Sequence, residues 1–147
     1  MTTHTIIDGN KTHYLALIDI WQASVEATHH FLNQTDINEL KPLILEHYFD
    51  AVQLKCAINT AGDILGFVGV ADNNIEMLFI APYASGQGIG SLLTQYAITK
   101  LSANKVDVNE QNPNALGFYQ HMGFTVKSRS ELDGQGKPFP LLHLALS

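Results

Sequence analysis

This 147-residue chain has one cysteine, few basic residues and no long apolar run. With Cys56 alone, no internal disulfide can form, which predicts a reducing, cytoplasmic setting. No run of about 18 or more apolar residues occurs, so we expect no membrane partner and no membrane span. The N-terminal stretch MTTHTIIDGNK lacks a basic flank followed by an apolar core, so the sequence predicts no secretory signal.

The eight lysines and arginines are outnumbered by 14 acids, which gives a formal net charge of −6. A nucleic-acid partner generally requires clustered bases that neutralise phosphates, so we expect none. The charge is also uneven. Residues 1–76 have ten acids and three lysines, whereas residues 77–147 have four acids and five bases. The first half therefore favours a cationic partner, and the second half tolerates an anion.

The hydrophobic pattern predicts a single domain over residues 1–147, because 46% of the residues are apolar and no repeat or linker occurs. Short apolar or alternating segments, bounded by turn residues, predict strands at 5–8, 52–58, 64–71, 75–80, 105–109, 124–132 and 141–146. Helices are predicted at 14–31, 36–49, 89–101 and 113–122. The second helix is expected to begin at Asp36, with Glu39 as its capping-box partner. The order β-α-α-β-β-β-α-β-α-β-β is that of an α+β or mixed α/β layer fold.

Three glycines alternate in the stretch SGQGIGSLL, residues 85–93, between a predicted strand and a predicted helix. The first amides of a helix have no intrahelical partner, and the helix dipole adds about half a positive charge there. Such a loop can bind an anion, and glycines let the ligand approach the backbone closely. A phosphate-binding P-loop requires Gly-Lys-Ser/Thr, but the chain has Ile89-Gly90-Ser91, which disfavours nucleotide hydrolysis.

Three other interpretations of the glycine loop stay open. Gly86-x-Gly88-x-x-Ser91 approaches the dinucleotide-binding fingerprint, with Asp107 as a candidate ribose ligand. That fingerprint ordinarily follows the first strand of a βαβ series, whereas here two helices and three further strands lie between the first predicted strand and the loop. A tight loop that only packs is the second interpretation. The third is a loop that holds the diphosphate of coenzyme A.

Two motifs resemble the GCN5-related N-acetyltransferase (GNAT) superfamily. Residues 78–82 followed by 86–90 are similar to that family's acetyl-CoA loop, and residues 108–124 are similar to its motif N-x-x-A-x-x-F-Y-x-x-x-G-F. The stretches 21–32 and 136–142 look like a small bacterial branch of the family. The resemblance implies a mixed, mostly antiparallel sheet of about seven strands flanked by about four helices.

The resemblance also implies an enzyme that uses acetyl-CoA as cosubstrate and acetylates an amine by direct attack in a ternary complex. The acidic first half favours a cationic amine, and the chain is expected to be a monomer or homodimer. One departure is Ser85, which stands where the family has Arg or Gln. It keeps open an alternative, an acyl-CoA-binding sensor with little catalysis. The implied coenzyme contacts are Leu78, Phe79, Ile80, Ser85, Gly86, Gln87, Gly88, Ile89, Gly90, Ser91, Asn112, Ala115 and Tyr119.

Acetyl transfer requires a neutral amine, a hydrogen-bond donor for the tetrahedral oxyanion and a proton for the departing thiolate. Tyr119 is the candidate acid, because a phenol is protonated at neutral pH. The alternative is that Tyr119 is only a core aromatic. Glu76 is the candidate base, expected in a sheltered position on the face of Leu78 and Ile80. A backbone N–H within residues 79–81 is the donor that the resemblance implies.

Other candidates lie around these motifs. Asn112 is predicted to cap a helix that begins at Pro113, and the resemblance implies that it also touches the pantetheine arm. Gly117 costs about 1 kcal/mol inside a helix, which predicts a closely packed neighbour, either coenzyme or a strand. His29 and His30 are adjacent and point apart on a helix, and no other pair has ligand spacing, so we expect no metal. His29 is a candidate for the acceptor cleft.

Overall fold

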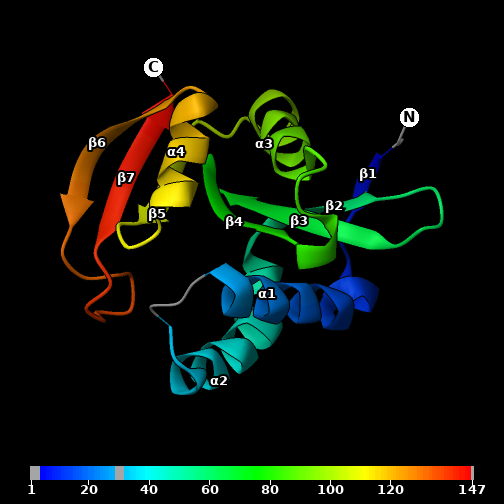
Figure 1. Cartoon of the computed structure of the whole chain (residues 1–147), viewed down its shortest axis with the longest axis horizontal. Helices are drawn as coiled ribbons and strands as arrows, with labels where there is room; N and C mark the ends of the chain where they lie inside the picture. The colour runs from blue at the N-terminus through cyan, green and yellow to red at the C-terminus, as the bar shows by residue number, and fades with distance from the viewer. Residues whose placement is uncertain (1–3, 29–31, 147) are drawn as a thin grey trace.

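The computed structural model describes residues 4–28 and 32–146, and these form the predicted order of seven strands and four α-helices (Figure 1). This α+β arrangement confirms the expected fold class. The strands are β1 (Thr5–Asp8), β2 (Gln53–Ile58), β3 (Ile64–Ala71), β4 (Asn74–Ile80), β5 (Lys105–Asn109), β6 (Phe124–Ser130) and β7 (Leu141–Leu146). The helices are α1 (Tyr14–Thr28), α2 (Gln34–Leu43), α3 (Ile89–Lys100) and α4 (Pro113–His121).

The start of α2 differs from the prediction. Asn33 is the N-cap, and its side chain accepts a hydrogen bond from the backbone N–H of Asp36 at 2.9 Å. The Asp36 carboxylate in turn accepts from the N–H of Asn33 at 3.1 Å. Asp36 is therefore the third residue of the helix, and Glu39 takes no part in the cap. The prediction was wrong because Asn and Asp are both strong N-caps and stand three residues apart.

The pairing of neighbouring strands is shortest between β4 and β5, in the middle of the sheet. The strand order is β1-β2-β3-β4-β5-β7-β6, and only β4 and β5 among these neighbours are parallel. These two strands pair only at Asn74 with Lys105 and Ile75 with Val106. Beyond that point they diverge, as Figure 1 shows, and the sheet is open between residues 76–80 and 107–109.

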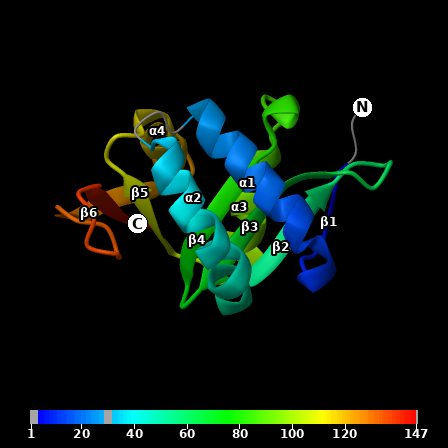
Figure 2. The ribbon, with the colours of Figure 1, turned by 90° about the horizontal axis from the view of Figure 1, so that it is seen from below.

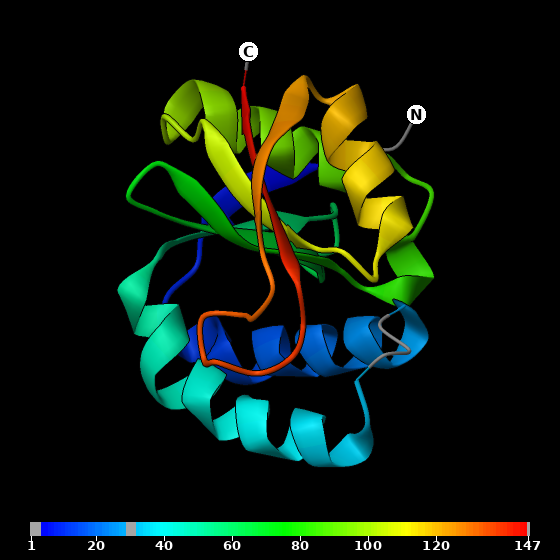
Figure 3. The same cartoon turned by 90° about the vertical axis from the view of Figure 1, so that its left-hand side faces the viewer.

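The helices form two layers around this sheet. Helices α1 and α2 cover one face, and α3 and α4 lie over the other (Figures 2 and 3). Phe67 of β3 is fully buried, and its ring centroid lies 5.8 Å from those of both Phe49 and Phe79. Burying one such side chain contributes about 1.5–3 kcal/mol. As far as the described residues extend, no helix has the length and apolar character needed to cross a membrane.

Candidate active site

An open groove of about 500 Å³ begins beside the C-terminal end of α1 and passes the end of β4 to α3 and α4. It brings together residues that are far apart in the sequence, because the divergence of β4 from β5 leaves that end of the sheet uncovered. Ser24, Ala27 and Thr28 of α1 form one wall. The predicted coenzyme contacts that line the groove are Leu78, Phe79, Ile80, Ser85, Gly90, Asn112, Ala115 and Tyr119.

The glycine loop presents backbone amides at the rim of this groove. Gly86 and Gly88 have φ angles of 81° and 78°, in the left-handed region that glycine adopts without strain. Gly88 is the N-cap of α3 and has no side chain that could cap the helix. Ser85 N–H donates to the carbonyl of Pro82 at 3.2 Å, and Leu92 N–H donates to Gly88 at 3.0 Å.

Between these two bonds, the N–H groups of residues 86–91 donate to no backbone carbonyl in the described part of the chain. They lie at the positive end of the α3 dipole. Unpaired amides of this kind form a site for an anion such as a diphosphate. Of the predicted loop contacts, Gly86, Gln87 and Gly88 are exposed, Ile89 is buried, and Ser91 is half-buried.

Tyr119 has its ring in the core and also borders the groove. The side chain is 7% exposed, and its ring packs against Phe118 and Phe124 at centroid distances of 5.1 and 5.7 Å. Burial raises the pKa of Tyr119 well above that of a free phenol, so the hydroxyl is protonated at neutral pH. Its oxygen makes no hydrogen bond to another described residue, yet it is not fully buried, so it is accessible from the cavity that the residue lines. The hydroxyl therefore faces a cavity.

Glu76 is more exposed than the sequence predicts. The register of β4 on β3 shifts between Gly69 and Val70, which leaves Glu76 without a partner residue on β3. Ile75 and Met77 on either side are buried, whereas Glu76 is exposed. The expectation of a sheltered carboxylate was wrong, because a β-bulge changes which side chains turn outward. Glu76 nevertheless lines a crevice of about 140 Å³ between β4 and β5, together with Tyr119.

The backbone of β4 limits which amide can serve as an oxyanion donor. Ala81 N–H donates to the carbonyl of Leu65 at 2.8 Å, so it is occupied. Successive N–H groups of a strand point to opposite edges, so the N–H of Phe79 also points toward β3. The N–H groups of Leu78 and Ile80 point toward the open side, where β5 has diverged. Within the expected range 79–81, only Ile80 has the required direction.

Three further predictions have different outcomes. Asn112 caps α4 as predicted, because its side chain accepts from Ala115 N–H at 3.2 Å and Pro113 is the first helical residue. Gly117 is exposed, and apart from its chain neighbours and the nearby backbone of α4 no heavy atom of the described residues lies within 4 Å of the position that a Cβ would take. The predicted packing of a strand against it is therefore wrong. His29 lies outside the described residues. In residues 4–28 and 32–146, no three metal-binding side chains gather at one point.

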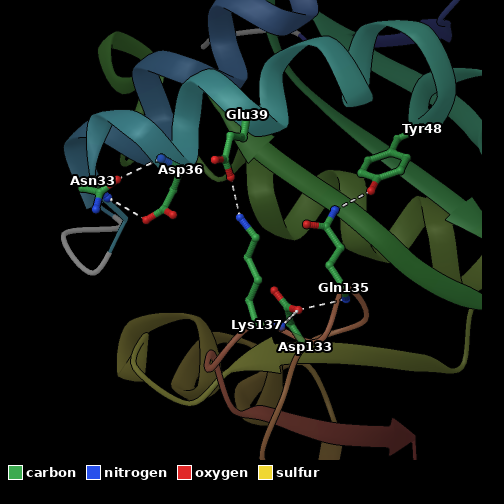
Figure 4. A network of polar contacts seen from close by, with 7 residues as sticks. All are labelled: Asn33, Asp36, Glu39, Tyr48, Asp133, Gln135 and Lys137. Atoms are coloured by element: carbon green, nitrogen blue, oxygen red, sulfur yellow. Dashed lines mark hydrogen bonds and ion pairs between the residues drawn. The ribbon is translucent and has the colours of Figure 1, made fainter.

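Sequence reasoning missed a contact between α2 and the connection from β6 to β7, residues 131–140. Figure 4 shows Lys137 reaching Glu39 on α2, with Nζ and Oε2 2.7 Å apart. Gln135 donates to the hydroxyl of Tyr48, in the helical turn that follows α2, at 2.5 Å. The connection closes a hollow of about 200 Å³, whose lining includes Asp36 and Asp133. Lys137 and Glu39 are 98 residues apart, and no local motif marks such a pair.

Comparison with known proteins is consistent with this geometry. The family model described as acetyltransferase (GNAT) domain matches residues 22–140. The peptidyl-lysine N-acetyltransferase YjaB of Salmonella typhimurium is 42% identical over 128 residues, which cover 87% of this chain and 88% of that protein. The solution structure of apo YjaB from Escherichia coli matches with a TM-score of 0.86 at 36% identity, over 97% of each chain.

A more distant structure shares the fold. PaiA N-acetyltransferase of Thermoplasma acidophilum, solved in complex with coenzyme A, matches with a TM-score of 0.75 over 99% of each chain. The two sequences are 17% identical, so this likeness supports the fold alone.

Proposed function

The chain belongs to the acetyltransferase (GNAT) domain family, and we propose that it transfers an acetyl group from acetyl-CoA to the side-chain amine of a lysine in a peptide or protein. One observation carries the proposal. The segment of unpaired amides at the start of α3 borders, at Gly90, the same groove that Tyr119 with its protonated phenol lines. The first suits a diphosphate, and the second suits a departing thiolate. The relatives named peptidyl-lysine N-acetyltransferase support the choice of acceptor.

The residues of the groove fit a long, thin thioester. Amides of residues 86–91 would hold the diphosphate, while Leu78, Ala115 and the wall of α1 would contact the pantetheine arm. Asn112 caps α4 and lines the same groove, so it can serve both roles. The acyl group would then lie at the opening between β4 and β5.

The amine is expected to enter from the α1 and α2 side, where Asp36 and Asp133 line the hollow closed by residues 131–140. Lys137 lines the same hollow, so the two carboxylates leave its lining with one net negative charge, which favours a cationic acceptor. The amine loses its proton to water that is hydrogen-bonded to Glu76 and attacks the thioester carbonyl. The N–H of Ile80 stabilises the oxyanion. As the carbon–sulfur bond breaks, Tyr119 donates its proton to the thiolate.

Direct attack is favoured over an acetyl-cysteine intermediate. Cys56 is fully buried, and burial raises the pKa of its thiol to about 11. Because the thiolate is the nucleophilic form, an inaccessible thiol with so high a pKa is a poor acceptor. Initial-rate patterns should therefore be those of a ternary complex.

The proposal is tested with the purified chain, acetyl-CoA and a lysine-containing peptide. We expect saturable thiol release that equals the amount of acetyl-lysine found by peptide mass spectrometry, with intersecting double-reciprocal plots for the two substrates. The control peptide has every lysine ε-amine dimethylated and its N-terminus blocked, and we expect no release above the hydrolytic background. Tight binding of acetyl-CoA without turnover on any amine tested would contradict the proposal and favour a sensor.

Ser85 provides a separate prediction about coenzyme affinity. Its N–H is bonded to Pro82, so only its exposed hydroxyl can reach a phosphate. A guanidinium at this position adds a charge-assisted hydrogen bond, so Ser85→Arg is expected to strengthen acetyl-CoA binding by about 1–2 kcal/mol. Calorimetric titration measures the effect, with Ser85→Ala as the control that only removes the hydroxyl. An unchanged affinity in Ser85→Arg would show that position 85 does not face the diphosphate.

A further inference from the structure

Three side chains on adjacent strands form a hydrogen-bonded chain that the proposed acetyl transfer does not use. Asp107 Oδ1 on β5 lies 2.6 Å from Nδ1 of His143 on β7. The other ring nitrogen, Nε2, lies 2.6 Å from Oγ of Ser130 on β6. Asp107 and His143 are direct partners in the β5–β7 ladder, and Ser130 is paired with the neighbouring region of β7. A serine, a histidine and an aspartate are thus connected in that order.

The hydrogen bonds determine the tautomer of the histidine. A carboxylate only accepts hydrogen bonds, so Nδ1 of His143 carries the proton that it donates to Asp107. In a neutral imidazole the other nitrogen is then an acceptor, so the Ser130 hydroxyl donates to Nε2. This is the arrangement in which a histidine takes the proton of a serine as the oxygen attacks a carbonyl. Such an arrangement is recognised by geometry and roles, and it occurs on unrelated folds.

We propose that Ser130 is a nucleophile, activated by His143 and Asp107, that accepts an acyl group from small activated esters and thioesters. Its Oγ forms a bond to the carbonyl carbon, and the bond from that carbon to the leaving oxygen or sulfur breaks. The serine proton passes to Nε2 of His143 and then to the leaving group. The products are an ester on Ser130 and a free alcohol or thiol.

The surroundings determine how fast this reaction can be. The side chains of His143 and Asp107 are 33% and 41% exposed, and Ser130 is half-buried, so a small reagent can reach the hydroxyl. β6 pairs with β7 on one side and is the last strand of the sheet on the other, so its outward N–H groups lie in the plane of the sheet. Side chains stand out of that plane, so these N–H groups are not directed at an acyl group on Oγ of Ser130. Solvent is therefore left to stabilise the oxyanion, whereas preorganised donors are usually a large contribution to catalysis. We expect slow, stoichiometric acylation rather than rapid turnover.

The test uses p-nitrophenyl acetate with the intact chain in the absence of coenzyme A. Site-resolved mass spectrometry follows acetylation of Ser130 and of Ser128, an exposed serine that is paired with His143 across the ladder but has no hydrogen bond to its ring in the described part of the chain. General-base assistance contributes about 10²–10⁴-fold, so we expect Ser130 to react at least about tenfold faster than Ser128. Alkaline hydroxylamine should remove the Ser130 label but leave acetylated lysines, because under these conditions it cleaves oxygen esters and not amides.

Two nearly isosteric variants separate activation from simple exposure. His143→Gln removes the base, and Asp107→Asn removes the carboxylate that orients it, so each should lower the Ser130 rate to that of Ser128. Thermal melts check that both variants are folded. Tyr119→Phe should leave the Ser130 rate unchanged, which keeps this test independent of the acetyltransferase groove. Equal rates at Ser130 and Ser128 in the wild type, or an unaffected rate in a folded His143→Gln variant, would overturn the proposal.

Discussion

Tyr119→Phe is expected to lower kcat for amine acetylation by about 10²–10⁴-fold, the usual contribution of a positioned general acid. The substitution keeps the ring that packs against Phe118 and Phe124, so stability and acetyl-CoA affinity should change little. Steady-state kinetics, calorimetry and a thermal melt measure the three quantities. The loss arises because the buried phenol, whose pKa burial raises, is the proton source for the thiolate.

The donor provides a sharper test of this role. An aromatic thiolate leaves readily without a proton. Acetyl transfer from the thioester of an aromatic thiol should therefore be much less sensitive to Tyr119→Phe than acetyl transfer from acetyl-CoA. Tyr96→Phe is the matched control, since Tyr96 is a half-buried tyrosine on α3 outside the groove lining. If Tyr119→Phe lowered kcat by the same factor with both donors, the phenol would not act as the proton donor to the thiolate. Undiminished turnover with acetyl-CoA would leave Tyr119 only its packing role.

Gly88→Asp is expected to weaken acetyl-CoA binding by about 2–4 kcal/mol, or about 30- to 1000-fold. Two unit charges about 5 Å apart repel by about 3 kcal/mol at an effective dielectric constant of about 20, and the carboxylate also competes for the amides before α3. No heavy atom lies within 4 Å of a Cβ at this position, so the side chain fits. Calorimetric titration measures the affinity.

Gly88→Asn is the matched control for that substitution. Both side chains have the same shape and tolerate the left-handed conformation, so the strain from a φ of 78° is shared and the difference isolates the charge. A carboxylate at the start of a helix is also favourable, so free Gly88→Asp should melt no lower than Gly88→Asn. Equal acetyl-CoA affinities in the two variants would show that the anion binds elsewhere.

Local features of this fold were predictable from the sequence. Asn112 and Pro113 mark the start of α4 because a cap and a fixed proline φ act within a few residues. The bounds of β1, β3, β5 and β7 followed from the two-residue period and the turn residues around them. The GNAT-like motifs identified the family because each places glycines or aromatics at fixed spacing within one segment.

Features that depend on distant residues were not predictable. The exposure of Glu76 depends on a register shift in the partner strand β3, which no pattern in residues 74–80 reveals. The pair of Lys137 with Glu39 joins segments 98 residues apart. Asp107 was weighed as a ribose ligand, whereas the structure places it beside His143, 36 residues away. In each case the outcome depends on how segments distant in the sequence pair or pack in the fold, which a single sequence does not encode locally.

The short pairing between β4 and β5 has a mechanical consequence. Strands β1–β4 and strands β5–β7 are joined by only two residue pairs of the β4–β5 ladder, so the sheet has its fewest backbone hydrogen bonds at this junction. The groove touches both sets of strands, with Leu78 on one and Ala115 of α4 beside the other. A ligand in the groove therefore contacts both parts of the sheet. Because the ligand binds the folded state, it raises the free energy of unfolding, and it does so by holding β1–β4 and β5–β7 together where the protein without ligand has the fewest strand contacts.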